Sequence, residues 1–290
     1  MINFLHTFHP SSTLISFTST AIYYYGLFMI LGILASIVVI LILAKHQQIK
    51  QELIIDLIFW LLIWGIIGAR FYHILLELPF YLNHPLNIFK IWNGGLAIHG
   101  AIIAGMLVIY YFSKKHQLNF WKLSTTIIIG LPLAQAIGRW GNYFNQELFG
   151  LPTNLPWGIP ISLKNRLSDY LSFQYFHPTF LYESIGDLII FIILITLYFA
   201  LFKKQVNSHK PTAINYKLCV ISYAILYSFL RFFLEFLRID PTPLIFNLRF
   251  PQFISLLIFF SSITYLIFII KCFLKNKNNY DSIKNVNTTK

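Results

Sequence analysis

The chain has 290 residues, of which 57% are hydrophobic and only 11% are charged, and its mean hydropathy is +0.66. Globular domains carry about a quarter charged residues, so the composition excludes an ordinary soluble protein and indicates an integral membrane protein. The formal net charge of +12 does not indicate nucleic-acid binding, because the lysines lie in short loops between apolar segments, where they set membrane orientation.

Seven segments are long and apolar enough to cross a bilayer, which takes about 20 residues. They lie near 22–43, 53–75, 95–112, 119–139, 179–202, 216–238 and 252–274. The third is short and contains His99, and the fourth carries Lys122 and Pro132. We therefore predict an all-α polytopic membrane domain over residues 1–274, with about seven transmembrane helices.

Basic residues are unevenly distributed among the loops. Ten follow the first, third and fifth spans or lie near the C-terminus: Lys45, Lys50, Lys114, Lys115, Lys203, Lys204, Lys210, Lys271, Lys275 and Lys277. The other loops hold four: Lys90, Lys164, Arg166 and Arg249. Because basic loops stay in the cytoplasm, we expect the N-terminus outside and the C-terminus inside. The first twenty residues lack Lys and Arg, so we expect no cleaved signal peptide.

Two segments outside the spans have a distinct composition. The loop over residues 140–178 combines four prolines with several aromatic residues, and we predict that it folds as a small extracytoplasmic cap. The alternative is a passive connector. Residues 275–290 are rich in Asn and Lys, and we predict a disordered cytoplasmic tail there.

The most polar stretch close to the membrane is Gly138 to Gly150. Arg139 stands at the end of a predicted span, where a guanidinium is costly unless it reaches the headgroups, pairs or binds an anion. A simple helix-end anchor is the alternative for Arg139. However, Asn142, Asn145 and Glu147 add hydrogen-bonding groups that an anchor does not need. The stretch therefore predicts a functional site.

Charged and polar residues within the spans cluster toward one side of the membrane. In the predicted orientation, the outer half contains Tyr25, Arg70, Tyr72, His99, Arg139, Glu183, Arg231, Glu235 and Arg238. A conduction path would distribute such residues over the full depth. The clustering predicts one site that opens outward.

One helix face carries Arg231, Glu235 and Arg238 at spacings i, i+4 and i+7. An ion-pair ladder that satisfies itself is the alternative interpretation. With Arg139 and Arg70 added, however, the positive charges outnumber the acidic partners, and a buried cationic surplus requires an anion.

The candidate proton acceptors are His99, Glu147 and Glu235. A lone His on an apolar face is often structural, but nearby arginines would disfavour protonation of His99, and a neutral imidazole accepts protons near pH 7. The sequence leaves the choice open. No histidines stand at i, i+4 and no carboxylates have divalent-ligand spacing, so we expect no metal. Cys219 and Cys272 lie in apolar runs and are expected to be free thiols.

The stretch from Gly138 to Gly150 resembles the signature of the prolipoprotein diacylglyceryl transferases. Further similar motifs are Tyr25-Gly26, the run Gly94 to Gly100, the run His177 to Glu183, and Tyr227 with Arg231, Glu235 and Arg238. The resemblance covers most of the chain. Two positions depart from the family pattern: Phe180 stands where Gln is common, and Ala101 where many members have Gly.

The resemblance implies an enzyme of the bacterial cytoplasmic (inner) membrane without a cofactor. It would move diacylglycerol from phosphatidylglycerol to the lipobox cysteine of a prolipoprotein, forming a thioether and releasing glycerol 1-phosphate. The implied catalytic residues are His99, Arg139, Arg231, Glu147 and Glu235. The implied substrate-binding residues are Arg139, Asn142, Asn145, Gly150, Tyr25, Arg70, Tyr227, Arg238 and Glu183.

The residues considered without the resemblance require only recognition of an anion in the outer leaflet. A protein that binds or transports an anionic lipid or organic anion is therefore the alternative function. A structural subunit of a membrane complex would leave the arginine surplus unexplained.

Overall fold

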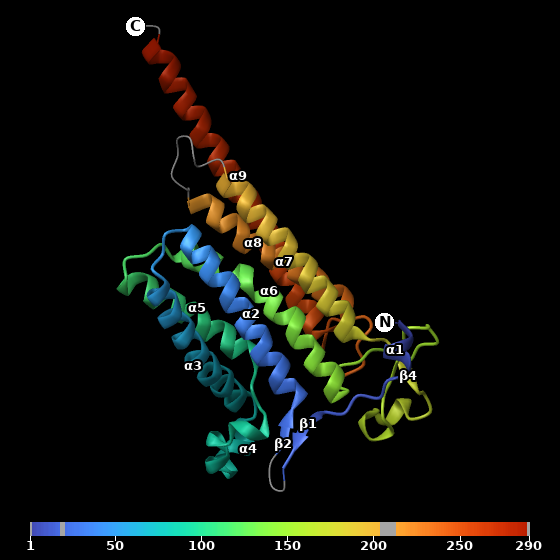
Figure 1. Ribbon diagram of the computed structural model, residues 1–290. Coiled ribbons are helices and arrows are strands. Elements are labelled where there is room, and N and C mark those ends of the chain that lie inside the picture. Colours follow the sequence, from blue (N-terminus) through green and yellow to red (C-terminus); the bar gives the residue numbers. More distant parts are fainter. Residues whose placement is uncertain (1, 18–20, 204–212, 289–290) are drawn as a thin grey trace. The chain divides into compact units, whose positions relative to one another are not determined.

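The computed structural model describes all residues except 1, 18–20, 204–212 and 289–290 (Figure 1). The chain forms two compact units, one made of residues 1–37 and 128–290 and the other of residues 38–127. Two long helices, α2 (Tyr24–His46) and α6 (Phe120–Asn145), run from one unit into the other.

Six helices in the described residues are long and apolar enough to cross a membrane. They are α2, α3 (Gln51–Leu76), α6, α7 (Thr179–Lys203), α8 (Ala213–Leu234) and α9 (Phe250–Thr288). The third predicted span forms α5 (Ile98–Lys115), which ends in two lysines and is not among the six. The prediction of an all-α polytopic membrane protein is confirmed.

The remaining described elements are short. They include α1 (Ile2–Thr7), α4 (Leu78–Asn83) and four 3₁₀ helices: η1 (Pro85–Phe89), η2 (Ile91–Asn93), η3 (Leu163–Asn165) and η4 (Ser168–Tyr170). Three two-stranded antiparallel sheets complete them: β1 (Thr13–Ser16) with β2 (Ala21–Tyr23), β3 (Ile159–Pro160) with β4 (Tyr175–Phe176), and β5 (Leu244–Ile245) with β6 (Leu248–Arg249).

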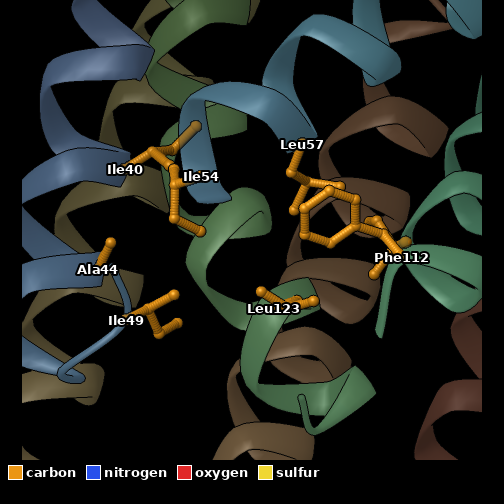
Figure 2. Close-up of a cluster of buried hydrophobic side chains, with 8 residues drawn as sticks. Ile40, Ala44, Ile49, Ile54, Leu57, Phe112 and Leu123 are labelled. Carbon is orange, nitrogen blue, oxygen red and sulfur yellow. The ribbon is translucent and has the colours of Figure 1, made fainter. Parts of the chain in front are cut away.

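The core of the unit over residues 38–127 is mainly aliphatic, with one buried phenylalanine. Figure 2 shows Ile40, Ala44, Ile49, Ile54, Leu57, Phe112 and Leu123 in this buried cluster. Helices α3 and α5 approach closely where Gly68 faces Gly100: a Cβ on Gly100 would lie 2.0 Å from the Gly68 carbonyl oxygen. Small residues are what let two membrane helices pack backbone to backbone.

In the other unit, α7, α8 and α9 run side by side (Figure 1), and the cap packs on the N-terminal helix. Leu5 of α1 is buried with Tyr143, Phe149, Ile161 and Phe176. The sequence did not predict this role for α1. The first residue of the segment predicted over 140–178 is also different in the structure. Helix α6 continues to Asn145, and the turn begins at Gln146, whose φ is 51°.

The part of α9 that is apolar enough to cross a membrane is Phe250–Cys272. The disordered cytoplasmic tail over residues 275–290 stays a prediction.

Gly32 is required where α2 meets α6. A Cβ on Gly32 would lie 2.7 Å from the carbonyl oxygen of Ala134, whereas a Cβ on Gly65, in α3, would meet no atom within 4 Å. We predict that Gly32→Ala lowers the melting temperature of the detergent-solubilised protein, with a cost of about 1–3 kcal/mol for overpacking. Gly65→Ala is the matched control and should be neutral or slightly stabilising. Equal effects of the two variants would contradict this account.

Candidate functional site

Three arginines converge on one buried carboxylate, Glu183 of α7. Arg139 Nη2 lies 2.6 Å from Glu183 Oε1, Arg231 Nη1 lies 3.7 Å from the same oxygen, and Arg238 Nη2 lies 3.6 Å from Oε2. Arg139 lies within α6, six residues before its end at Asn145, and Arg231 belongs to α8. The predicted clustering of these four residues is therefore seen in the structure.

A second carboxylate extends this group. Glu235 Oε2 lies 2.8 Å from Arg231 Nη2, and Glu235 Oε1 accepts a hydrogen bond of 2.8 Å from Arg249 Nε. Arg249 also pairs with Asp240 at 3.4 Å. The sequence analysis missed Arg249, which it counted only as a loop charge. We call Arg139, Arg231, Arg238 and Arg249, with their three acidic partners, the arginine cluster.

Within the arginine cluster, Arg139 and Arg231 are more exposed than the two carboxylates that they contact. The side chains of Arg139 and Arg231 are 22% and 17% exposed, whereas those of Glu183 and Glu235 are 1% and 0% exposed. Four guanidiniums meet three carboxylates in these ion pairs. Burial, with Arg231 as a like-charged neighbour, lowers the pKa of Arg238, but an arginine stays charged at neutral pH. The cluster thus offers positive charge to an anion on its exposed side.

One N–H group of Arg231 lacks a hydrogen-bond acceptor. Its Nη1 is buried and has no hydrogen-bond partner among the described residues, and 3.7 Å to Glu183 is longer than a hydrogen bond. A phosphate oxygen would supply the acceptor that this N–H lacks, and guanidinium forks match phosphate oxygens well.

Glu147 lies in a separate polar group at the end of α6. Its Oε1 accepts hydrogen bonds from Asn142 Nδ2 at 2.7 Å and from Asn145 Nδ2 at 3.4 Å. Glu147 and Asn145 border a cavity of about 640 Å³, whose other walls come mainly from β2 and α2. The cavity is mostly apolar, with Ser12, Leu14, Ile22, Tyr23, Tyr25, Gly26, Leu27 and Ile30 on its walls.

Tyr25 connects this cavity with the arginine cluster, because it lies within electrostatic reach of both Glu147 and Arg139. It approaches α6 closely: a Cβ on Gly141 would lie 2.8 Å from the Tyr25 ring. The side chain at position 141 must therefore be absent for Tyr25 to occupy this place.

One helical turn after Glu183, further polar residues of α6, α7 and α8 lie in the interior of the unit. Asp187 of α7 is fully buried, and neither of its oxygens has a hydrogen-bond partner among the described residues. Tyr223 donates to Gln135 Oε1 at 3.0 Å and stacks on Tyr227. The sequence analysis missed Asp187. It is an acidic residue four positions after Glu183 in an apolar run, and such a residue usually indicates a functional position.

Arg70 and His99 belong to the other unit. The five N–H groups of Arg70 donate to the backbone carbonyls of Ile88, Gly94, Gly95, Asn87 and Lys90, so the guanidinium is used up within that unit. His99 begins α5, and its ring lies 5.7 Å from the Tyr72 ring. Participation of His99 in the site remains a prediction, whereas the Arg70 guanidinium has no N–H group left for a substrate.

The cap contacts the start of α7 and the segment that follows α8. Gly150 pairs with Arg238 in an isolated bridge, and a Cβ there would lie 2.8 Å from the Leu237 carbonyl oxygen. His177 Nδ1 lies 3.2 Å from the Tyr182 hydroxyl, which also accepts a hydrogen bond of 2.8 Å from Trp157. Burial lowers the pKa of His177, which favours the neutral ring over the protonated one.

Phe180 has a packing role in this chain. It is 4% exposed, stacks on Tyr143 with ring centroids 4.7 Å apart, and meets the edge of Trp140 at 5.4 Å. A side chain within this aromatic group makes no polar contact, so the position where the family often has Gln serves the core of the cap here.

Comparison with known proteins shows the family of this chain. The family model described as prolipoprotein diacylglyceryl transferase matches residues 12–268. A phosphatidylglycerol--prolipoprotein diacylglyceryl transferase from Nostoc sp. strain PCC 7120 is 43% identical over 85% of this chain and 85% of its own length. A protein of the same name from Synechocystis sp. strain PCC 6803 is 41% identical over 81% of this chain and 81% of its own length. Another from Prochlorococcus marinus subsp. pastoris is 37% identical over 92% of this chain and 95% of its own length. The chain belongs to the prolipoprotein diacylglyceryl transferase family.

Proposed function

We propose that this membrane enzyme transfers the diacylglyceryl group of phosphatidylglycerol to the lipobox cysteine of a prolipoprotein, the first step of lipoprotein maturation. The cysteine sulfur attacks the glyceryl carbon that carries the phosphate ester. A carbon–sulfur bond forms, the carbon–oxygen bond to the phosphate breaks, and glycerol 1-phosphate leaves with the bonding electron pair. The thiol proton passes to a base.

The convergence of Arg139, Arg231 and Arg238 on buried Glu183 is the observation that carries this proposal. A departing phosphate gains negative charge, and fixed positive charge in a site of low dielectric constant stabilises it without reorganisation. The buried carboxylate holds the guanidiniums in place, while their exposed side meets the ligand.

The cavity beside Tyr25 suits the apolar part of a substrate. Its walls are largely aliphatic, and its polar edge carries Asn145 and Glu147. Asn142 supports that edge by donating to Glu147, Gly150 pairs with Arg238 of the arginine cluster, and Tyr227 of α8 lies within electrostatic reach of Glu183 and Arg139. We propose these residues, with Tyr25, as the part of the site that positions the lipid.

His99 is the proposed base. Both oxygens of Glu235 are engaged by guanidiniums, and Oε1 of Glu147 already accepts from two amide groups. A proton on either carboxylate would disturb these contacts. Neutral imidazole is the usual proton acceptor near pH 7.

The test is product formation. Purified protein in vesicles that contain phosphatidylglycerol, given a lipobox peptide, should yield a thioether-linked diacylglyceryl peptide and one glycerol 1-phosphate per peptide. A peptide with Ser in place of the lipobox Cys is the control and should remain unmodified. Binding of phosphatidylglycerol without either product would favour the alternative, an anionic-lipid binding or transport protein.

We also propose that the enzyme lies in the bacterial cytoplasmic membrane, with the membrane domain 1–274 oriented N-terminus outside, the cap outside and the tail 275–290 inside. The loop over 203–215, predicted to be cytoplasmic, lies mostly outside the described residues. The support for the orientation is the bias of basic residues among the loops.

Cysteine labelling checks this orientation. Leu163 on the cap is 62% exposed, so a cysteine there is accessible, whereas Pro160 is buried in β3. In a background with Cys219→Ser and Cys272→Ser, we predict that Leu163→Cys reacts with an impermeant maleimide in intact spheroplasts. Reaction only after the membrane is broken would reverse the orientation.

A further inference from the structure

Asp56 is an acidic residue that belongs neither to the arginine cluster nor to the cavity beside Tyr25. It lies five residues after the start of α3, about 7.5 Å along the helix, and its side chain is exposed on a helix apolar enough to span a membrane. In the part of the chain that the structure describes, no basic group lies within ion-pair distance of Asp56. A charged residue at such a position is costly and usually marks a site.

Asp56 borders a cavity of about 720 Å³ between α3 and α5. The wall from α3 is Asp56, Trp60 and Trp64, at spacings of one helical turn. The wall from α5 is Ala104, Leu107, Val108, Tyr111, Phe112 and Lys115, followed by His116. Both walls lie in the unit formed by residues 38–127, so the cavity belongs to one unit alone.

The cavity is polar at one end and apolar along the rest. The two helices run antiparallel, because Gly68 faces Gly100 while Asp56 shares the cavity with Lys115. The start of α3 and the end of α5 therefore bring Asp56, Lys115 and His116 together. The aromatic stripe beyond them extends about 12 Å toward Trp64, at 1.5 Å per residue.

We propose that this cavity is a phospholipid site, separate from the arginine cluster, for a glycerophospholipid whose headgroup adds hydrogen-bond donors to its phosphate. Phosphatidylglycerol is such a lipid and phosphatidylcholine is not. Lys115 and His116 meet the phosphate, Asp56 accepts from the donors beyond it, and an acyl chain lies along Trp60, Trp64 and Tyr111. The pair of opposite charges is what selects this headgroup, because an apolar groove alone would not distinguish lipids.

The position of the charged end agrees with a headgroup site. It lies at the start of α3 and the end of α5, next to the basic loops over 45–50 and 114–115 that are predicted to be cytoplasmic. Aromatic residues with adjacent lysines are typical of the region between headgroups and acyl chains. By the same orientation, the lipid belongs to the cytoplasmic leaflet, whereas the transfer site is predicted to face outward.

Photo-crosslinking in vesicles tests the proposal. The probes are phosphatidylglycerol and phosphatidylcholine with the same diazirine-bearing acyl chain, and peptide mass spectrometry maps the adducts. We expect phosphatidylglycerol adducts on residues 60–64 and 104–112 at about tenfold the level of phosphatidylcholine adducts, the size of one hydrogen bond to a charged group. Asp56→Ala and Lys115→Ala should each reduce the phosphatidylglycerol adducts to the phosphatidylcholine level.

Lys114 provides the matched control, because its Nζ lies over the Tyr110 ring, 5.8 Å from the centroid, and it does not line the cavity. Lys114→Ala should keep full headgroup selectivity. Equal labelling by the two lipids, or equal effects of Lys114→Ala and Lys115→Ala, would overturn the proposal. Lys115→Ala should also retain transfer activity, so the adduct map and the product assay report on the two sites independently.

Discussion

Arg139→Ala and Arg231→Ala are each expected to abolish transfer while the protein remains at its normal level in the membrane. Each substitution removes a guanidinium that lies against Glu183 on the exposed side of the arginine cluster. Loss of one such donor lowers a rate by about two to three orders of magnitude or more. Both side chains lie at the surface of the cluster, so neither change opens a large apolar cavity.

The measurement is the rate of thioether formation at saturating lipobox peptide, normalised to protein in the membrane. Lys164→Ala, which removes an exposed positive charge on the cap, is the control and should be close to wild type. Rates within tenfold of wild type for both arginine variants would contradict the assignment of phosphate to the cluster.

Lysine substitutions refine this expectation. Arg139→Lys and Arg231→Lys keep the charge but lose the planar fork that contacts two oxygens at once. Arg231 also holds Glu235 through Nη2 while its Nη1 has no hydrogen-bond partner among the described residues, and a single ammonium cannot reproduce this division of roles. We therefore expect both lysine variants to fail substantially, and near-normal transfer by both would exclude bidentate recognition.

The sequence predicted the membrane fold and the arginines within the spans because each depends on the pattern of nearby residues. Apolar runs of about twenty residues identify spans, and a guanidinium within such a run stands out against it. Arg139 and the face with Arg231, Glu235 and Arg238 were found in this way, before any three-dimensional contact was known.

Contacts between distant segments could not be predicted in the same way. Arg249 reaches Glu235 only because β5 and β6 form a tight hairpin after α8, with Phe246 and Asn247 at positive φ. Arg70 was expected in the site, but backbone carbonyls of the loop after α4 bind all five of its donors. Backbone groups are the same for every residue, so the side-chain pattern carries no signal for them.

The role of α1 was missed for a related reason. Its six residues are too few for a periodic pattern, and Leu5 becomes a core residue only when the cap folds around it. His6 adds a hydrogen bond of 2.8 Å to the Gly158 carbonyl oxygen and stacks on Tyr175. Such contacts span about 150 positions in the chain, beyond the reach of local sequence reasoning.

His99→Gln is expected to lower the transfer rate about 10²–10⁴-fold, the usual contribution of a general base, with little change in lipid affinity. The thiolate is the nucleophile, so the rate should also fall on acidification as the base takes up a proton. Free imidazole titrates near ~6.5, whereas carboxylates titrate near ~4. An acidic limb in the imidazole range that disappears in His99→Gln would identify the base.

Two controls separate this result from a general loss of structure. His84→Gln removes an exposed histidine of the same unit and should leave both the rate and the pH profile unchanged. Glu147→Gln keeps the hydrogen-bonding shape of a carboxylate that accepts from Asn142 and Asn145, and it should retain the imidazole-range limb whatever its effect on the rate. If Glu147 or Glu235 is the base instead, the acidic limb moves toward carboxylate values and His99→Gln is mild. A loss of less than about tenfold in His99→Gln would rule out His99, because a general base contributes more than this.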